Sequence, residues 1–237
     1  MTGFEYQGNE LDLFRHARNW KRYCADHLRP FITGRVVEVG AGIGTTASVL
    51  MEHGSTSWTC LEPDARLYER LKTVMTSQRS AASCRIVCGT LDDLDPAERF
   101  DTVLYVDVLE HIRDDRAELA RSAGRLRSGG RLVVLAPAHQ WLFSPFDRAI
   151  GHHRRYTRST LLEAAPSSLR SVTAFYLDSA GLLASLVNRV ALRAAYPTRS
   201  QIRVWDSLLV PTSRLLDPIG RYHLGKSVVG VWTRRDS

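Results

Sequence analysis

An alternation of short apolar runs with helical stretches, which begins at Arg35, constrains the fold more than any other feature. The runs predict strands at residues 36–39, 57–61, 85–87, 102–106 and 132–136, with helices between them to about His53, to about Thr76 and over 115–126. Strands that alternate with helices form parallel βαβ units with right-handed crossovers. Strand centres without polar residues indicate a sheet that is covered on both faces.

Two further β-like runs, at 172–177 and 228–232, lie near the end of the sequence with mainly helical residues between them. If the two runs pair, the residues between them form an insertion at the sheet edge, placed to roof a pocket. The alternative is ordinary core or dimer packing. We therefore predict an α/β, Rossmann-like fold with three parts: an N-terminal helical cap at 1–33, a main domain at 34–178 and 227–237, and a helical insertion at 179–226.

The cap and the insertion both show helical periodicity. An amphipathic helix is expected over about 10–30. In the insertion, an apolar helix is expected over 181–196. A second begins near Gln201 and is interrupted at Pro211 and Pro218, because proline lacks the N–H that a helix interior uses.

The composition, with 44% hydrophobic and 24% charged residues, is that of a globular protein that buries a core. A formal charge of +7 favours acidic partners, but the basic residues are scattered rather than clustered, so nucleic acid is disfavoured. Four cysteines without a Cys-x-x-Cys pair, no signal-peptide pattern and no long apolar run predict a cytoplasmic protein with reduced thiols and no membrane span.

A glycine-rich turn, Gly40-x-Gly42-x-Gly44, joins the first predicted strand to its helix. Glycine has no Cβ, so this backbone can form a tight turn and approach a ligand closely. The following helix offers free N–H groups and the positive end of its dipole. The spacing departs from the dinucleotide fingerprint, in which two residues precede the last glycine.

An acidic residue, Glu62, ends the second predicted strand, about twenty residues after the glycines. A carboxylate at this place can accept hydrogen bonds from both hydroxyls of an adenosine ribose. The structural alternative, an acid that caps the next helix, suits Asp64 better than Glu62. The turn and the acid together favour an adenosine-containing cofactor.

These segments and three later ones resemble the successive motifs of class I S-adenosylmethionine-dependent methyltransferases. They are most similar to the small-molecule group that includes ubiquinone-type O-methyltransferases. The motifs lie within about 34–137 and comprise 38–44 (EVGAGIG), Glu62, 89–92 (GTLD), 100–111 (FDTVLYVDVLEH) and 126–134 (LRSGGRLVV). The resemblance implies a seven-stranded, mostly parallel sheet with an antiparallel last strand, S-adenosyl-L-methionine as cofactor, S-adenosyl-L-homocysteine as product, and no metal.

Carried over position by position, the resemblance also implies cofactor contacts. The methionine part would meet Glu38, Gly40, Ala41 and Gly42 in the turn that Gly44 closes. The ribose would meet Glu62, the adenine would meet Thr90 and Leu91, and Asp107 would lie near the amino-acid end. Pro63, next to Glu62, is a further candidate cofactor contact.

Two of these positions carry alternatives. Many relatives have an acid where Thr90 stands, so the contact to the adenine amino group falls here to Asp92 or to backbone. Trp20 belongs to an Asn-Trp pair that resembles an N-terminal motif closing over the cofactor. Its indole would attract a sulfonium through cation–π interaction, or it is simply packed beneath its helix.

Methyl transfer from a sulfonium is an in-line displacement, so the protein must align a nucleophile, exclude water and, where needed, remove a proton. Two histidines follow predicted strands at the pocket end: His111, the leading general-base candidate, and His139. A purely local hydrogen-bonding role is the alternative for each.

A polar run at 151–156 (GHHRRY) has a counterpart in a subset of the methyltransferase group. Arginine matches carboxylates and phosphates bidentately, so an anionic acceptor could be bound here. The alternative is that the run pairs with acids and fixes a long loop. The candidate substrate-binding residues are His152, His153, Arg154, Arg155 and Tyr156.

The favoured function is methyl transfer to an oxygen or nitrogen of a small molecule, in specialised metabolism. One alternative is a regulatory or interaction module that retains cofactor binding. Another is an enzyme that methylates carbon or a lipid-linked acceptor at a membrane surface, with helix 181–196 at the interface. DNA amino-methyltransferases carry an Asn/Asp-Pro-Pro-aromatic tetrad where this chain has 107–110 (DVLE), which disfavours DNA.

Overall fold

The computed structural model describes residues 10–51, 57–76, 84–187 and 197–235. Within these ranges, seven strands form one sheet in the order β3-β2-β1-β4-β5-β7-β6. Neighbouring strands are parallel except at β7, which pairs antiparallel with both β5 and β6. The predicted Rossmann-like sheet is confirmed. The strand bounds are β1 (Arg35–Val39), β2 (Ser57–Glu62), β3 (Cys84–Cys88), β4 (Phe100–Val106), β5 (Leu126–Pro137), β6 (Leu169–Leu177) and β7 (Ser227–Arg234).

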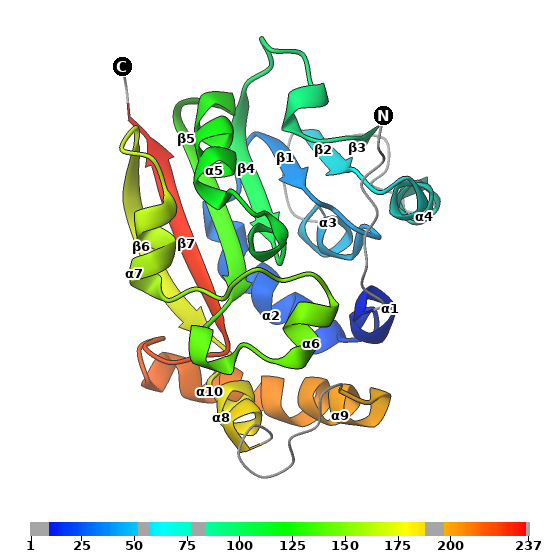
Figure 1. Cartoon of the computed structure of the whole chain (residues 1–237), viewed down its shortest axis with the longest axis vertical. Helices are drawn as coiled ribbons and strands as arrows, with labels where there is room; N and C mark the ends of the chain where they lie inside the picture. The colour runs from blue at the N-terminus through cyan, green and yellow to red at the C-terminus, as the bar shows by residue number, and fades with distance from the viewer. Residues whose placement is uncertain (1–9, 52–56, 77–83, 188–196, 236–237) are drawn as a thin grey trace.

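Helices cover both faces of the sheet (Figure 1). Between the strands lie α3 (Thr45–Leu50), α4 (Ala65–Thr76), α5 (Asp115–Arg125), α6 (Pro145–Ala149) and α7 (Arg158–Ala164). The predicted helix ends at Thr76 and near Leu126 agree with α4 and α5. α3 ends at Leu50, and His53, the predicted end of that helix, lies outside the described residues.

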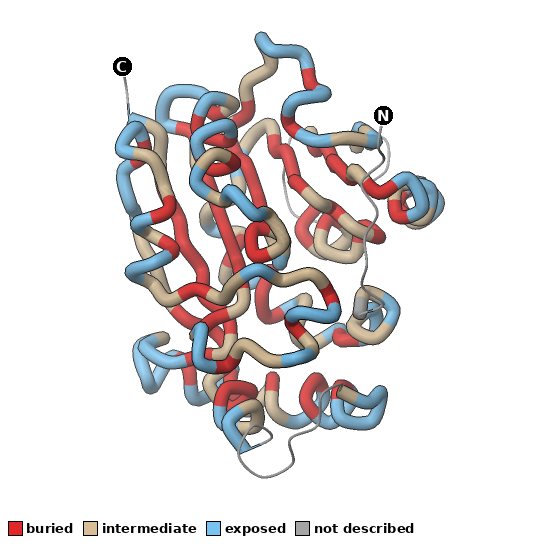
Figure 2. The backbone as a smooth tube through the Cα atoms, in the orientation of Figure 1, coloured by how far each residue is buried: buried red, intermediate tan, exposed pale blue. Residues whose placement is uncertain are grey.

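Two apolar clusters form the core, one on each face of the sheet, whose inner strands β1, β2, β4, β5 and β7 are buried along most of their length (Figure 2). Successive residues of a strand point to opposite faces, so Leu104 belongs to one cluster and Tyr105 to the other. The Leu104 cluster includes Tyr23 of the cap and Trp205 of the insertion, whereas the Tyr105 cluster includes Leu119 of α5. The cap and the insertion therefore pack on the same face.

The cap contains α1 (Glu10–Phe14) and α2 (Arg18–Leu28) in place of the single helix expected over 10–30. The insertion begins with α8 (Ser179–Val187), and residues 188–196 of the predicted helix 181–196 lie outside the described residues. α9 (Arg199–Val204), the π turn η8 (Trp205–Leu209) and α10 (Val210–Ile219) then follow one another without a break. α10 packs against both α8 and α2 (Figure 1).

The predicted interruptions at Pro211 and Pro218 are wrong. Pro211 stands in the first turn of α10, directly after η8, where the π turn has already shifted the hydrogen-bond register. Pro218 stands in the last turn, one residue before the helix ends at Ile219. Among the described helices, none has both the length and the apolar character needed to cross a bilayer.

Candidate active site

A cavity of about 1300 Å³ opens at the carboxyl ends of β1 and β4. These strands are neighbours, while β2 lies on the other side of β1, and ligands of open α/β sheets bind where the strand order reverses in this way. The wall includes Trp20 of the cap, Gly42 and Asp107 of the strand ends, and Trp205 of the insertion. The volume exceeds that of a typical pocket for one small ligand.

The glycine turn and Glu62 meet at one side of the cavity. The N–H of Gly42 donates a hydrogen bond to Oε2 of Glu62 at 2.8 Å, and the N–H of Asp64 donates to Oε1 at 2.9 Å. Burial raises the pKa of Glu62, and these two backbone hydrogen bonds oppose the shift. Asp64 itself accepts hydrogen bonds from the N–H groups of Arg66 and Leu67, so it takes the helix-capping position predicted for it.

The three glycines of the turn differ in role. All have positive φ, at 67° for Gly40, 57° for Gly42 and 79° for Gly44. Gly40 and Gly42 line the cavity, and a Cβ on Gly40 would lie 2.8 Å from Val108. Gly44 is not among the lining residues; it precedes α3, and a Cβ there would lie 2.6 Å from Leu71. Gly44 therefore allows the conformation of the turn and its packing against Leu71 without facing the cavity.

Glu38 is a buried acid on the cavity wall, 2% exposed, in contact with Trp58. The indole Nε1 of Trp58 donates a hydrogen bond to its Oε2 at 3.1 Å. Burial raises the pKa of Glu38 to about 8, and the Trp58 hydrogen bond acts in the opposite direction. A cationic ligand group beside Glu38 would stabilise its ionised form.

On the predicted adenine side, Thr90, Leu91 and Asp92 all line the cavity, as does Pro63 beside Glu62. The N–H and the hydroxyl of Thr90 both donate to Oδ2 of Asp93, at 2.8 and 3.1 Å, in a capping box that fixes the loop. The carboxylate of Asp92 is exposed and free to face a ligand edge, with Arg121 as a distant partner at 4.0 Å.

The cap and the insertion meet at Trp20. Asp206 accepts hydrogen bonds from the N–H groups of Asn19 and Trp20, at 3.2 and 2.8 Å, and so caps the start of α2 from η8. The rings of Trp20 and Trp205 lie 5.5 Å apart, and both line the cavity. Trp20 is therefore packed within its cap and also faces the ligand space. Sequence reasoning missed Trp205 and Asp206, which have no local motif.

Asp107 opens onto the cavity after β4, with a φ of 54°, a strained value for a residue other than glycine. Desolvation raises the pKa of Asp107 to about 7, opposed by the charges of Lys226 and Arg155. Lys226 also lines the cavity, with Nζ 5.1 Å from the centre of the Trp205 ring. It was not predicted, because a lysine before an apolar run carries no distinctive signal.

The two general-base candidates lie in different places. His111 lines the cavity, and burial lowers the pKa of its imidazole to about 3, so the ring is neutral at physiological pH. His139 is not among the lining residues; its ring stacks on Tyr176 with the ring centres 4.9 Å apart. The structure therefore brings His111, and not His139, to the cavity.

The run at 151–156 is divided between two sides. His152 and Arg155 line the cavity, whereas His153, Arg154 and Tyr156 do not. Arg154 forms an ion pair with Asp115 at 2.7 Å, and the hydroxyl of Tyr156 donates to the same carboxylate at 2.7 Å. For these two residues the structure shows the acid-pairing, loop-fixing arrangement.

The buried carboxylate of Asp147 organises the cavity side of this run. It accepts from Nε and Nη2 of Arg155 at 2.9 and 3.0 Å and lies 3.0 Å from Nδ1 of His152. Burial alone would raise the pKa of Asp147, but His152, Arg155 and Ser144 hold it below its ordinary value. Asp147 was not predicted as part of the site.

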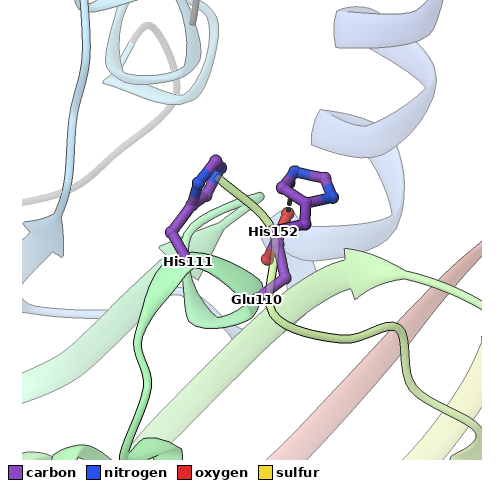
Figure 3. Close-up of side chains that lie close together, drawn as sticks. All are labelled: Glu110, His111 and His152. Carbon is purple, nitrogen blue, oxygen red and sulfur yellow. Dashed lines mark ion pairs between the residues drawn. The ribbon is translucent and has the colours of Figure 1, made fainter. Parts of the chain in front are cut away.

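Glu110, another acid that sequence reasoning did not select, lies beside His111 and His152 (Figure 3). One potential ligand atom from each of the three residues lies within 4.8 Å of the others. Glu110 is 1% exposed, and within the described part of the chain neither of its carboxylate oxygens has a hydrogen-bond partner.

The sheet with an antiparallel β7, the glycine turn after β1 and the buried acid after β2 define the architecture of class I S-adenosylmethionine-dependent methyltransferases. Residues 37–132 match the family model described as a methyltransferase domain. The resemblance seen in the sequence is confirmed over this segment, which is less than half of the chain.

A curated relative, the ubiquinone biosynthesis O-methyltransferase of Bradyrhizobium sp. (strain ORS 278), is 31% identical over 107 residues, which cover 45% of this chain. That match spans only 41% of the relative's length.

Two solved structures share the fold. The N-methyltransferase NodS from Bradyrhizobium japonicum WM9, in complex with S-adenosyl-L-homocysteine, has a TM-score of 0.59 at 14% identity, covering 97% of this chain and 93% of its own. The [4+2]-cyclase SpnF has a TM-score of 0.63 at 12% identity, covering 97% and 96%. Because a cyclase has this fold, the fold alone does not decide the reaction.

Proposed function

We propose that this protein transfers a methyl group from S-adenosyl-L-methionine to an oxygen or nitrogen of a small molecule. The observation that carries the proposal is the carboxylate of Glu62, which is fixed by the N–H groups of Gly42 and Asp64 at the cavity wall. A carboxylate has about four lone-pair sites, so two remain for the hydroxyls of a ribose.

The residues around Glu62 fit the rest of that cofactor. Glu38 and Asp107 would hold the ammonium of the methionine part, and both lie on the wall beyond Gly40 and Gly42. Leu91, Pro63 and Thr90 would border the adenine, with Asp92 near its amino group. When bound, the cofactor supplies an electrophilic methyl group on a sulfonium. The wall formed by Trp20 and Trp205 would then shield the sulfonium from water.

On the acceptor side, His111 is our candidate general base. Its imidazole lies on the cavity wall and is neutral, with a pKa that burial holds below that of an efficient base. Negative charge that develops on the acceptor oxygen or nitrogen would raise this pKa and favour proton transfer to the ring. Arg155 is the candidate contact for an anionic group on the acceptor. It presents a cation to the cavity while Asp147 holds two of its donors.

We also propose that the described residues of the cap (10–33) and of the insertion (179–187 and 197–226) act together as the cavity cover. The Asp206 cap on α2 and the contact between Trp20 and Trp205 join the two segments directly. The cover would exclude water from the methyl group, and it would admit the acceptor between α8 and α6, which both contribute lining residues.

The experiment that tests this function has two parts. Calorimetry measures S-adenosyl-L-methionine binding to the purified protein. A coupled assay then measures S-adenosyl-L-homocysteine release with a panel of small phenols, carboxylated phenols and amines. Binding together with acceptor-dependent release supports the proposal. Cofactor binding without S-adenosyl-L-homocysteine release with any acceptor class favours the regulatory module. Absence of cofactor binding contradicts the proposed function.

A further inference from the structure

We propose that Glu110, His111 and His152 form a binding site for one divalent transition-metal cation, such as zinc. The site lies at the acceptor end of the cavity. The metal site itself is independent of the reaction. Its catalytic role, activation of an acceptor hydroxyl, rests on the proposed function.

The first observation is an uncompensated carboxylate. Glu110 is 1% exposed, and neither Oε1 nor Oε2 has a hydrogen-bond partner among the described residues. Nε2 of His152 lies 3.7 Å from Oε1, within ion-pair range when the imidazole is protonated but too far for a hydrogen bond. A buried carboxylate without a partner is costly, and a bound cation would offset that cost.

The second observation is the convergence of ligand atoms. Glu110 and His111 stand in the turn after β4, and His152 reaches them from the loop after α6 (Figure 3). One ligand atom from each residue lies within 4.8 Å of the other two. The rings of His111 and His152 are nearly perpendicular, at 85°, with their centres 4.5 Å apart. Small side-chain rotations would bring all three atoms to about 2.0–2.2 Å from one ion.

The third observation is the support behind His152. Its Nδ1 lies 3.0 Å from Oδ1 of Asp147, which leaves Nε2 on the side of Glu110. In metal sites, a carboxylate commonly orients a ligating histidine in this way and fixes its tautomer. Asp147 is itself held by Arg155 and by Ser144, so the support is rigid.

Two imidazoles and one carboxylate are the ligand set of open catalytic zinc sites, in which the fourth position takes water or substrate. All three residues line the cavity, so that position faces the space for the acceptor. A cation there lowers the pKa of a bound hydroxyl. With His111 engaged as a ligand instead of as the general base, the hydroxyl proton would pass to water. The oxygen would form its bond to the methyl carbon, and the bond from that carbon to sulfur would break with its electron pair left on sulfur.

The test is titration of zinc chloride into chelator-treated protein, followed by calorimetry, with cobalt(II) as a spectroscopic probe in parallel. We expect one zinc per chain and a visible cobalt absorption typical of a low-coordinate site. Glu110→Gln and His152→Ala should each weaken zinc binding at least tenfold and remove the cobalt band. His223→Ala, which removes an exposed histidine outside the cavity, should change neither.

S-adenosyl-L-methionine affinity, measured on the same samples, reports folding and separates the two proposals. If the variants bind the cofactor and zinc as the unmodified protein does, or if the unmodified protein binds no zinc, the metal site is refuted while the proposed function stands. If Glu110→Gln does not fold, His152→Ala decides the question by itself. Zinc binding without cofactor binding supports the site and contradicts the proposed function.

Discussion

The N–H of Gly42 donates a 2.8 Å hydrogen bond to Glu62, and this contact joins the turn after β1 to the acid that ends β2. The other oxygen of Glu62 is held by the N–H of Asp64 at 2.9 Å. The carboxylate is therefore oriented before any ligand arrives. Preorganisation of this kind reduces the cost of ordering a side chain on binding, so the ribose hydroxyls would meet a fixed acceptor.

Glu38 gives the apoprotein a pH-dependent stability. Its pKa is raised by burial to about 8, from an ordinary value of 4.5, so the folded state holds a proton that the unfolded state releases. Stability is therefore lost as pH rises from about 4.5 to 8. Glu38→Gln removes this loss and can still accept from Trp58. We expect Glu38→Gln to melt several degrees above the unmodified apoprotein at pH 9, with little difference at pH 5.

Thermal melts of both proteins across that range, without cofactor, measure the difference. If the difference in melting temperature between the two proteins is the same at every pH, Glu38 is not the source of the pH-dependent stability.

Asp206 couples the insertion to the cap. Asp206→Ala leaves the N–H groups of Asn19 and Trp20 without their acceptor, and the loss of a helix cap costs about 1 kcal/mol. We expect a melting temperature lower by roughly 2–4 °C and a severalfold weaker affinity for S-adenosyl-L-methionine, since Trp20 would leave the cavity wall. Glu69→Ala, at an exposed acid on α4, is the control. An unchanged affinity of Asp206→Ala for S-adenosyl-L-methionine would show that the position of Trp20 does not affect cofactor binding.

His111 and His139 can be distinguished by turnover. We expect His111→Ala to slow methyl transfer by about 100-fold or more while cofactor affinity holds, because the imidazole lies on the cavity wall. His139→Ala should keep near-normal turnover, since its ring stacks on Tyr176 away from the lining. Steady-state rates of the two variants, with cofactor affinity measured by calorimetry, decide between them. The reverse pattern would move the base to His139.

Arg154 and Arg155 form a matched pair for testing recognition of the acceptor. Arg155→Lys keeps the charge but removes the guanidinium, whose several N–H donors can bind Asp147 and an acceptor anion at the same time. The KM for an anionic acceptor should therefore rise severalfold. Arg154→Lys should leave KM unchanged, because Arg154 pairs with Asp115 outside the cavity. Equal effects from both variants would argue against a direct contact from Arg155.

The sheet could be predicted because each strand is a local pattern of apolar residues. The glycine turn and Glu62 could be predicted because the backbone geometry after β1 and β2 limits which residue types can occupy those positions. The role of Asp64 followed from its position at a helix start, which the hydrogen bonds from Arg66 and Leu67 confirm.

The rest of the site depends on contacts between distant segments. Asp206 reaches α2 across 187 residues, and His152 meets Glu110 only because the loop after α6 folds back over β4. Arg154 and Arg155 are adjacent in the chain, yet the loop turns one to Asp115 and the other to Asp147. No local pattern encodes which partner each side chain meets.

In the function that we propose, Glu62 and the glycine turn together bind S-adenosyl-L-methionine. Calorimetric titration of the cofactor into the unmodified protein, Glu62→Ala and Glu163→Ala tests it most directly, because Glu163 is an exposed acid on α7. Loss of charge-assisted hydrogen bonds to the ribose should weaken binding by roughly 1.5–3 kcal/mol in Glu62→Ala, or about 10- to 100-fold in Kd, with Glu163→Ala unchanged. Equal Kd values for all three proteins would contradict the account.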